Sequence, residues 1–312
     1  MYSNLKLSLL VILYTRFLMV EAQILPSFEL NLEWKASIKS LLNSQKKITL
    51  IEKKKLLIFS LHTGYEHWSI PHSEAVMEII AQNSESFDTS LSKDISVFEK
   101  DQLSKYDVVI LNNNCPQVDR RDIFWDILKR ETSLDDRQII KKAGQLEKNL
   151  ISFVKKGKGL MILHGGIVMQ NNSLDFSDMV GGSFDYHPPQ QKINVKLVDP
   201  DHILVRDFDP EGFVHFDEPY FFKNAYFRYN FRPLLYIDID EITMNRKRPN
   251  DKIKYISWIK RFGKGRVFFS SPSHNAQSYD NPKFLQFLAN GLYYVAGFIS
   301  CDDSPIGHNK SP

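Results

Sequence analysis

Short, uninterrupted apolar runs alternate with amphipathic stretches along most of this chain. Residues 70–84 (IPHSEAVMEIIAQNS) carry apolar side chains at helical spacing, and a longer charged helical stretch lies within residues 117–158 and ends near Gly157. Three apolar runs are typical of strands buried on both faces: residues 55–61 (KLLIFSL), 107–114 (DVVILNNN) and 159–166 (GLMILHGG). Strands that alternate with helices in this way predict a parallel sheet with helices on both sides.

The second half of the chain contains more strands than helices. Residues 192–199 and 233–240 are strand-like, residues 255–272 form a hairpin that turns at FGKGR, and residues 281–297 form a closing amphipathic helix. Residues 23–54 are a mildly helical lead-in, and the polar residues 299–312 are predicted to be a disordered tail. We therefore expect one domain, residues 55–298, with an α/β three-layer sandwich fold and a mostly parallel central sheet.

The first 22 residues have the layout of a secretory signal peptide. Lys6 precedes the apolar run LSLLVILYTRFLMV, and VEA ends at Ala22 with small residues where a signal peptidase reads them. Arg16 interrupts the apolar run, which is short for a transmembrane span. The alternatives are an uncleaved anchor, a buried helix or a cytoplasmic protein. We expect cleavage, export to the periplasm or the medium, and no stable membrane association afterwards.

Composition excludes several classes of protein. The chain has 312 residues, of which 43% are apolar, and its formal charge is only +3. Its short basic clusters lack interleaved aromatic residues, so we expect no nucleic-acid partner. Two cysteines, Cys115 and Cys301, make neither a disulfide framework nor a cysteine-based metal site.

Polar residues gather where the predicted strands end. Ligands of parallel α/β sheets bind outside the carboxyl ends of the strands, so these residues are the candidates for chemistry. Histidine is prominent among them, because imidazole is a general base or a metal ligand at neutral pH. The candidates are His62, Tyr65 and His67 after the first strand, Asn112 to Cys115 including Asn113, His164 in LHGG, Phe184 and His187 in GGSFDYHPP, His215, Asp217 and Glu218 in HFDEP, and His274 in SPSHN.

Each candidate also has an ordinary structural explanation. His62 and His72 fit surface positions at a helix entrance, which we favour for His72, and His202 fits a turn. His215 fits an exposed strand position. Asp217 and Glu218 would point to opposite faces of a strand, and we favour Asp217 slightly as the reactive one.

The motifs in combination resemble the ThuA-like (trehalose-utilisation) family. The resemblance spans about residues 55–298 and rests on the order of FSLHTGYEHWSIPHSEAV, VILNNN, GLMILHGG, MVGGSFDYHPP, HFDEPYFF and the WIKRFGKGRVF block that ends in SPSHN. It implies a class I glutamine-amidotransferase-like, or flavodoxin-like, α/β sandwich. It also implies site roles for His67, His164, His187, Asp217, Glu218 and His274. Pro219 and the SPSH turn depart from the family pattern.

The resemblance implies a carbohydrate ligand. Family members accompany the use of trehalose and other disaccharides, often beside dehydrogenases that make 3-keto sugars. His164 stands where amidotransferases carry a nucleophilic cysteine, so glutamine chemistry is not expected. The leading hypothesis is an exported enzyme in which His164, His187, Asp217 and Glu218 catalyse and His67, Tyr65, Asn113, Phe184 and His274 bind the sugar.

Two alternatives remain open at this point. One is a non-catalytic carbohydrate-binding module on the same fold, because aromatic rings stack on sugars in binders and enzymes alike. The other concerns the cofactor: several neutral imidazoles with a carboxylate suit zinc or a similar divalent ion, although no strict ligand spacing is present. The sequence does not predict the oligomeric state.

Overall fold

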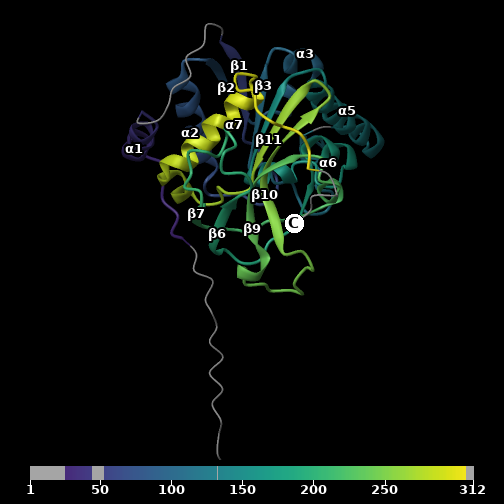
Figure 1. Ribbon diagram of the computed structural model, residues 1–312. Coiled ribbons are helices and arrows are strands. Elements are labelled where there is room, and N and C mark those ends of the chain that lie inside the picture. Colours follow the sequence, from purple (N-terminus) through teal and green to yellow (C-terminus); the bar gives the residue numbers. More distant parts are fainter. Residues whose placement is uncertain (1–24, 44–52, 132, 307–312) are drawn as a thin grey trace, which may run out of the picture.

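The computed structural model describes residues 25–43, 53–131 and 133–306, which form a central sheet with helices on both faces (Figure 1). The nine strands are ordered β2-β1-β3-β4-β11-β10-β9-β6-β7. In chain order they are β1 (Lys54–Phe59), β2 (Phe87–Ser92), β3 (Val108–Asn112), β4 (Gly159–Leu163), β6 (Gln191–Leu197), β7 (Phe213–Asp217), β9 (Arg232–Asp238), β10 (Ile253–Phe262) and β11 (Gly265–Ser270). A separate antiparallel pair consists of β5 (Ser183–Tyr186) and β8 (Phe221–Lys223). The predicted α/β fold class is confirmed.

Five strands form the parallel half of the sheet: β2, β1, β3, β4 and β11. Their apolar runs bury side chains on both faces. In β1, Leu56 and Ile58 belong to one core cluster, whereas Leu57 and Phe59 belong to the other. β3 and β4 repeat this alternation. A strand buried on both faces has no polar positions, which is why these three strands were predictable from uninterrupted apolar runs.

The other half of the sheet is antiparallel. β10 and β11 form the hairpin predicted at FGKGR, with Phe262 paired to Gly265 across a two-residue turn. Gly263 in this turn has φ +60°, and a Cβ there would lie 2.5 Å from the Lys155 carbonyl oxygen. Glycine is therefore required both by the backbone conformation and by the close approach to helix α5. β9, β6 and β7 continue the sheet in antiparallel order.

Helices cover the two faces of the sheet. On one face lie α1 (Leu32–Asn43), α2 (Ile70–Ser84) and α7 (Pro282–Val295); on the other lie α3 (Lys100–Leu103), α4 (Ile123–Glu131), α5 (Asp136–Lys155) and α6 (Leu174–Val180) (Figure 1). Asp135 begins α5 with a capping box in which its side chain accepts from the Gln138 backbone N–H. Within the described ranges, no helix is long and apolar enough to cross a membrane.

The described parts of the lead-in segment and of the C-terminal tail pack against the domain, which the sequence did not indicate. Helix α1 places Ile38 and Leu42 in the core beside α2 and α7. Asp303 accepts hydrogen bonds from Arg261 and Tyr294, and the Ile306 N–H donates to the Phe231 carbonyl. Residues 299–306 are therefore held against the domain rather than disordered. The predicted signal peptide, residues 1–22, and the tail residues 307–312 lie outside the described residues.

The edge strands of the sheet had weak sequence signals: β2 was not predicted, and β7 was indicated only by the strand positions considered for His215, Asp217 and Glu218. β2 (FDTSLS) is polar and lies at the sheet edge, where Phe87 alone is buried and Thr89 and Ser92 are half-buried. β7 is a five-residue strand at the opposite edge. Edge strands carry weaker apolar patterns because one side and much of one face meet solvent.

Two glycine-to-alanine substitutions in helices are expected to have opposite effects on stability. A Cβ at Gly291 in α7 would lie 2.6–2.8 Å from the Phe268 ring, so G291A should cost about 1–3 kcal/mol of unfolding free energy through overpacking. A Cβ at Gly144 in α5 meets nothing within 4 Å, so G144A should add about 0.5–1 kcal/mol. Urea denaturation of both variants measures this; a G291A protein as stable as wild type would contradict the close seating of α7 on β11.

Candidate functional site

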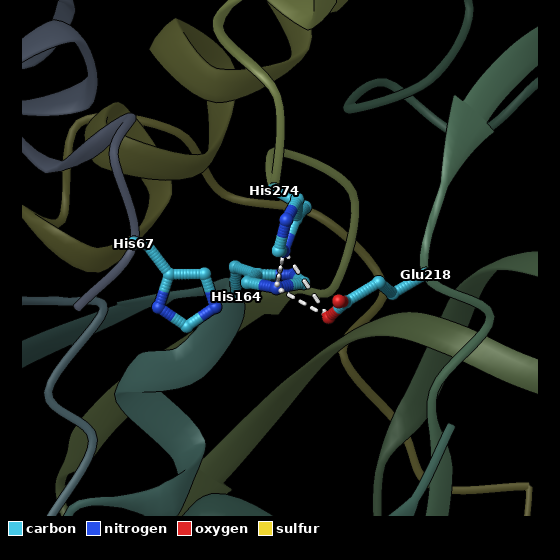
Figure 2. Close-up of side chains that lie close together, drawn as sticks. All are labelled: His67, His164, Glu218 and His274. Carbon is cyan, nitrogen blue, oxygen red and sulfur yellow. Dashed lines mark hydrogen bonds and ion pairs between the residues drawn. The ribbon is translucent and has the colours of Figure 1, made fainter. Parts of the chain in front are cut away.

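Loops from four strands bring three histidines and a carboxylate together. His67 lies between β1 and α2, His164 follows β4 directly, and His274 follows β11. Glu218 follows β7, and its carboxylate points toward His164 and His274 (Figure 2). The parallel strands β1, β4 and β11 end at the same edge of the sheet, which is where ligands bind in open α/β folds.

His164 occupies the sharp turn between β4 and the 3-10 helix η2 (His164–Val168). Its φ of +44° is a left-handed conformation that is uncommon outside glycine. The ring is fully buried, and its Nδ1 lies 2.6 Å from the Ser271 carbonyl oxygen. A carbonyl only accepts, so Nδ1 carries the proton and the Nε2 lone pair faces the cluster. The Tyr220 hydroxyl donates to this Nε2 at 2.8 Å.

Three polar atoms form a nearly equilateral triangle at the centre of the site. His164 Nε2 and His274 Nδ1 are 3.2 Å apart, and both approach Glu218 Oε2, at 3.4 Å and 3.1 Å respectively (Figure 2). All three side chains are buried. Groups this close in a region of low dielectric interact strongly and fix one another's protonation state.

Electrostatics favour charge on two of these groups. Burial opposes ionisation of Glu218, but the neighbouring His164 and His274 outweigh it and hold the pKa of this carboxyl well below its ordinary value. Burial likewise lowers the pKa of His274, yet the hydrogen bond and negative charge of Glu218 raise it overall. Both shifts favour a charged pair between the His274 imidazole and the Glu218 carboxylate in the metal-free chain.

His67 completes the group from the opposite side. Its ring stands edge-on to His164 and His274, with centroid distances of 4.9 Å and 5.0 Å. Burial, followed by the charges of those two histidines, lowers the pKa of His67 well below its ordinary value, so the ring is neutral. One ligand atom from each of His67, His164, His274 and Glu218 lies within 4.8 Å of the others. These four residues are thus able to hold a metal ion.

A pocket of about 400 Å³ opens above this cluster. Its volume lies within the range of about 300–1,000 Å³ that is usual for small-molecule sites. His67 and Glu218 form part of the floor, while Tyr65, Phe184 and Tyr220 supply aromatic walls. The pocket therefore combines apolar ring faces with a few converging polar atoms, as small-molecule sites do.

His187 lies at the rim of the pocket. Its side chain is 35% exposed, and its Nε2 is 3.6 Å from Glu218 Oε2. Its Nδ1 donates to the Pro188 carbonyl at 2.8 Å, which fixes the ring orientation. Of His67, His164, His187 and His274, it is the one whose side chain is not buried.

Comparison with known proteins agrees with this geometry. The family model described as "Trehalose utilisation" (ThuA) matches residues 55–295. The chain belongs to the ThuA family. Similar solved structures include putative ThuA-like proteins from Bacteroides uniformis (15% identity, 80% of this chain and 95% of that one, TM-score 0.58) and Parabacteroides merdae (16% identity, 80% and 92%, TM-score 0.54). At this identity they show the shared fold. No curated protein matches the chain.

In this ThuA-family chain the two neighbouring acids have different positions. We expected Asp217, slightly more than Glu218, to be the reactive acid. In the structure, Glu218 is the carboxylate that lies in the cluster. Asp217 is fully buried behind it and accepts from His215 Nε2 at 2.6 Å and from the backbone N–H groups of Ser273 and His274. Burial raises the pKa of Asp217, but the His215 hydrogen bond and nearby positive charge lower it to about 2. Asp217 therefore positions His274 and Glu218.

Asn113 and Cys115 follow the same strand but differ in their relation to the pocket: Asn113 lies behind it, whereas Cys115 borders it. Asn113 is fully buried, and its side-chain oxygen accepts from the Gly165 N–H just after His164. Asn113 therefore supports the turn at His164, and it is not among the residues that line the pocket, where substrate binding was predicted. Cys115 borders the pocket, with Sγ 3.9 Å from His67 Nδ1. Burial and the charge of Glu218 raise its thiol pKa to about 12, which does not suit a thiolate nucleophile.

The remaining histidines have structural positions. The surface position favoured for His72 is wrong: it is buried among the rings of Phe28, Trp34 and Trp68. His202 lies in a turn, as expected, and His62 pairs with Glu66 near the surface. His215 is buried in β7, not exposed, because it pairs with Asp217. His308 lies outside the described residues.

Two pocket residues had little signal in the sequence. The only sequence signal of Tyr220 is its aromatic ring, which does not indicate its hydrogen bond to His164. Arg121 lines the pocket from the loop before α4 and belongs to no motif. Its φ of +55° shows that the loop is shaped by tertiary contacts, which local sequence does not reveal.

Asp217→Asn should destabilise the protein, because Asp217 accepts the hydrogen bonds that hold the loops of the site. An amide offers one accepting oxygen where the carboxylate uses both, and its NH₂ would face N–H donors of the protein. Breaking this buried charged network should cost about 3–5 kcal/mol of unfolding free energy. Urea denaturation measures the loss, with the exposed Asp185→Asn as a matched control that should change stability by less than about 0.5 kcal/mol. An unchanged midpoint for D217N would contradict the supporting role.

Proposed function

We propose that this chain is an enzyme that acts on a sugar, namely a disaccharide, a glycoside or its 3-keto derivative. The observation that carries the proposal is the buried imidazole–carboxylate cluster at the floor of an aromatic-walled pocket. Membership of a family described by trehalose utilisation supports a carbohydrate ligand. A binding module needs the rings but has no use for a buried, charged cluster that costs desolvation energy.

The pocket walls suit a sugar ring. Phe184 and Tyr220 are in contact, with centroids 4.7 Å apart, and Tyr65 stands above His67 at 4.7 Å. Aromatic faces pack against the C–H faces of sugars, while the sugar hydroxyls take hydrogen bonds from polar groups nearby. In this arrangement the rings orient the sugar, and its reacting carbon and oxygen lie over the floor.

The reaction is divided between the floor and the rim. The floor presents the Glu218 carboxylate, which accepts hydrogen bonds from substrate hydroxyls. Arg121 lines the same pocket with positive charge, which stabilises negative charge that develops on a substrate oxygen in hydrolysis or elimination. His187 Nε2 takes a proton from water, or from a carbon or an oxygen atom of the substrate. It later returns this proton to the leaving oxygen. Tyr220 and Asp217 act indirectly, because they hold His164 and His274 in place.

Loss of the His187 imidazole should separate turnover from binding. A sugar library that includes 3-keto glycosides, read out by product mass, identifies the substrate. H187A should then lower kcat by about 10²–10⁴-fold, the usual contribution of a general acid–base, with little change in binding. H62A, whose imidazole is outside the pocket, is the matched control and should keep full activity.

The same screen separates an enzyme from a binding module. Saturable sugar binding by wild type and H187A, without a product from any sugar, would identify a carbohydrate-binding module and refute the proposed chemistry. Equal turnover by wild type and H187A would refute the role of His187.

We also propose that the chain is exported after cleavage of residues 1–22. The support is the basic, apolar and small-residue order of this segment. N-terminal sequencing of the protein from its native source should find Gln23 as the first residue, in the periplasmic or secreted fraction. A mature chain that still begins at Met1 would contradict export by this route.

A further inference from the structure

We propose that His164, His274, Glu218 and His67 bind one divalent transition-metal ion, with zinc as the best match to the donor set. This inference goes beyond the sugar chemistry and does not depend on it, because metal binding is measured without a substrate. Four protein ligand atoms within 4.8 Å of one another are the starting observation.

The central triangle has the dimensions of a metal site. Donors in a tetrahedral zinc site lie about 2.0–2.1 Å from the ion and therefore about 3.3–3.4 Å from one another. The three edges here are 3.1, 3.2 and 3.4 Å, between Glu218 Oε2, His274 Nδ1 and His164 Nε2. A point equidistant from these atoms is able to lie at bonding distance from all three. His67 closes the fourth side and needs the largest movement to reach the ion.

The groups behind the ligands fix them as metal-binding histidines are usually fixed. A ligating imidazole typically donates its other N–H to a carbonyl or carboxylate, which sets the tautomer and the ring orientation. His164 does this through Nδ1 to the Ser271 carbonyl. Asp217 holds the backbone of the His274 loop through the N–H groups of Ser273 and His274. Separate supports therefore hold His164 and the loop of His274. Because His164 Nε2 has one lone pair, the Tyr220 hydroxyl would release its hydrogen bond there when an ion binds.

Backbone strain next to the ligands supports a dedicated site. His164 has φ +44° and Ser273, which precedes His274, has φ +130°. Such conformations are strained and persist where the surrounding structure enforces them, commonly at functional sites. Here they turn both histidines toward the same point.

The donor set indicates which metals fit. Three imidazole nitrogens and one carboxylate oxygen suit zinc and neighbouring transition metals better than magnesium or calcium, which prefer oxygen ligands. His67 and Glu218 also border the pocket, so a bound ion has a side that faces substrate. The site therefore resembles a catalytic metal site, with access, more than a closed structural one. A bound ion would also add positive charge beside the pocket.

Elemental analysis tests the proposal directly. The full chain, purified without a polyhistidine tag or chelator, should contain about one equivalent of zinc or a neighbouring metal. After chelation, titration with Co²⁺ should give saturable visible absorption at one equivalent. H164Q and E218Q should each lose this absorption, whereas H187A should retain it and H62A should match wild type. Folded wild-type protein that takes up neither zinc nor Co²⁺ would overturn the proposal and leave the imidazolium–carboxylate pair.

X-ray absorption spectroscopy of the wild-type protein covers the case in which H164Q or E218Q fails to fold. The zinc edge should show imidazole scattering with nitrogen and oxygen neighbours at about 2.0–2.1 Å, and a sulfur shell at about 2.3 Å would overturn the ligand set because it would indicate Cys115. Metal that survives H164Q in a folded protein would also overturn it. Bound metal without turnover of any sugar would leave this inference standing and remove the proposed function.

Discussion

The fully buried carboxylate of Asp217 ties the two halves of the sheet to the site. It ends β7, the outermost antiparallel strand, yet it accepts hydrogen bonds from the loop that follows β11 in the parallel half. His215 from its own strand and the Glu218 N–H fill its remaining acceptor positions. Because a buried charge is tolerated only when it is paired, this arrangement has little freedom to relax. The hydrogen bonds of Asp217 therefore fix the positions of Glu218 and His274.

The parallel strands and the edge at which the site forms were predictable, for a simple physical reason. Strands buried on both faces must be apolar throughout, and the first polar residue after each of them marks the carboxyl edge. His164 and His274 were found in this way. The resemblance of the motifs to ThuA-like proteins gave the same fold, and the family match confirms it.

Other positions depend on contacts that no local pattern encodes. Which of the adjacent acids Asp217 and Glu218 enters the cluster follows from where the chain leaves β7, and their sequence positions do not indicate it. The burial of His72 follows from Phe28 and Trp34, which come from a segment read as a lead-in about 40 residues earlier. Asn113 looks like a rim residue by position, but its φ of +54° turns it under the backbone of Gly165. Tertiary structure decides these cases.

The four clustered side chains are spread from position 67 to position 274, and the last of them is held by a loop that precedes the closing helix α7. No shorter piece of the chain contains the complete ligand set. Uptake of the proposed ion would therefore be coupled to completion of the fold. Since cellular selectivity depends on which ions are available where a protein folds, a chain exported before folding would be loaded by the metal supply outside the cytoplasm. The compartment in which the chain folds, as well as its donor atoms, would then determine which ion is bound.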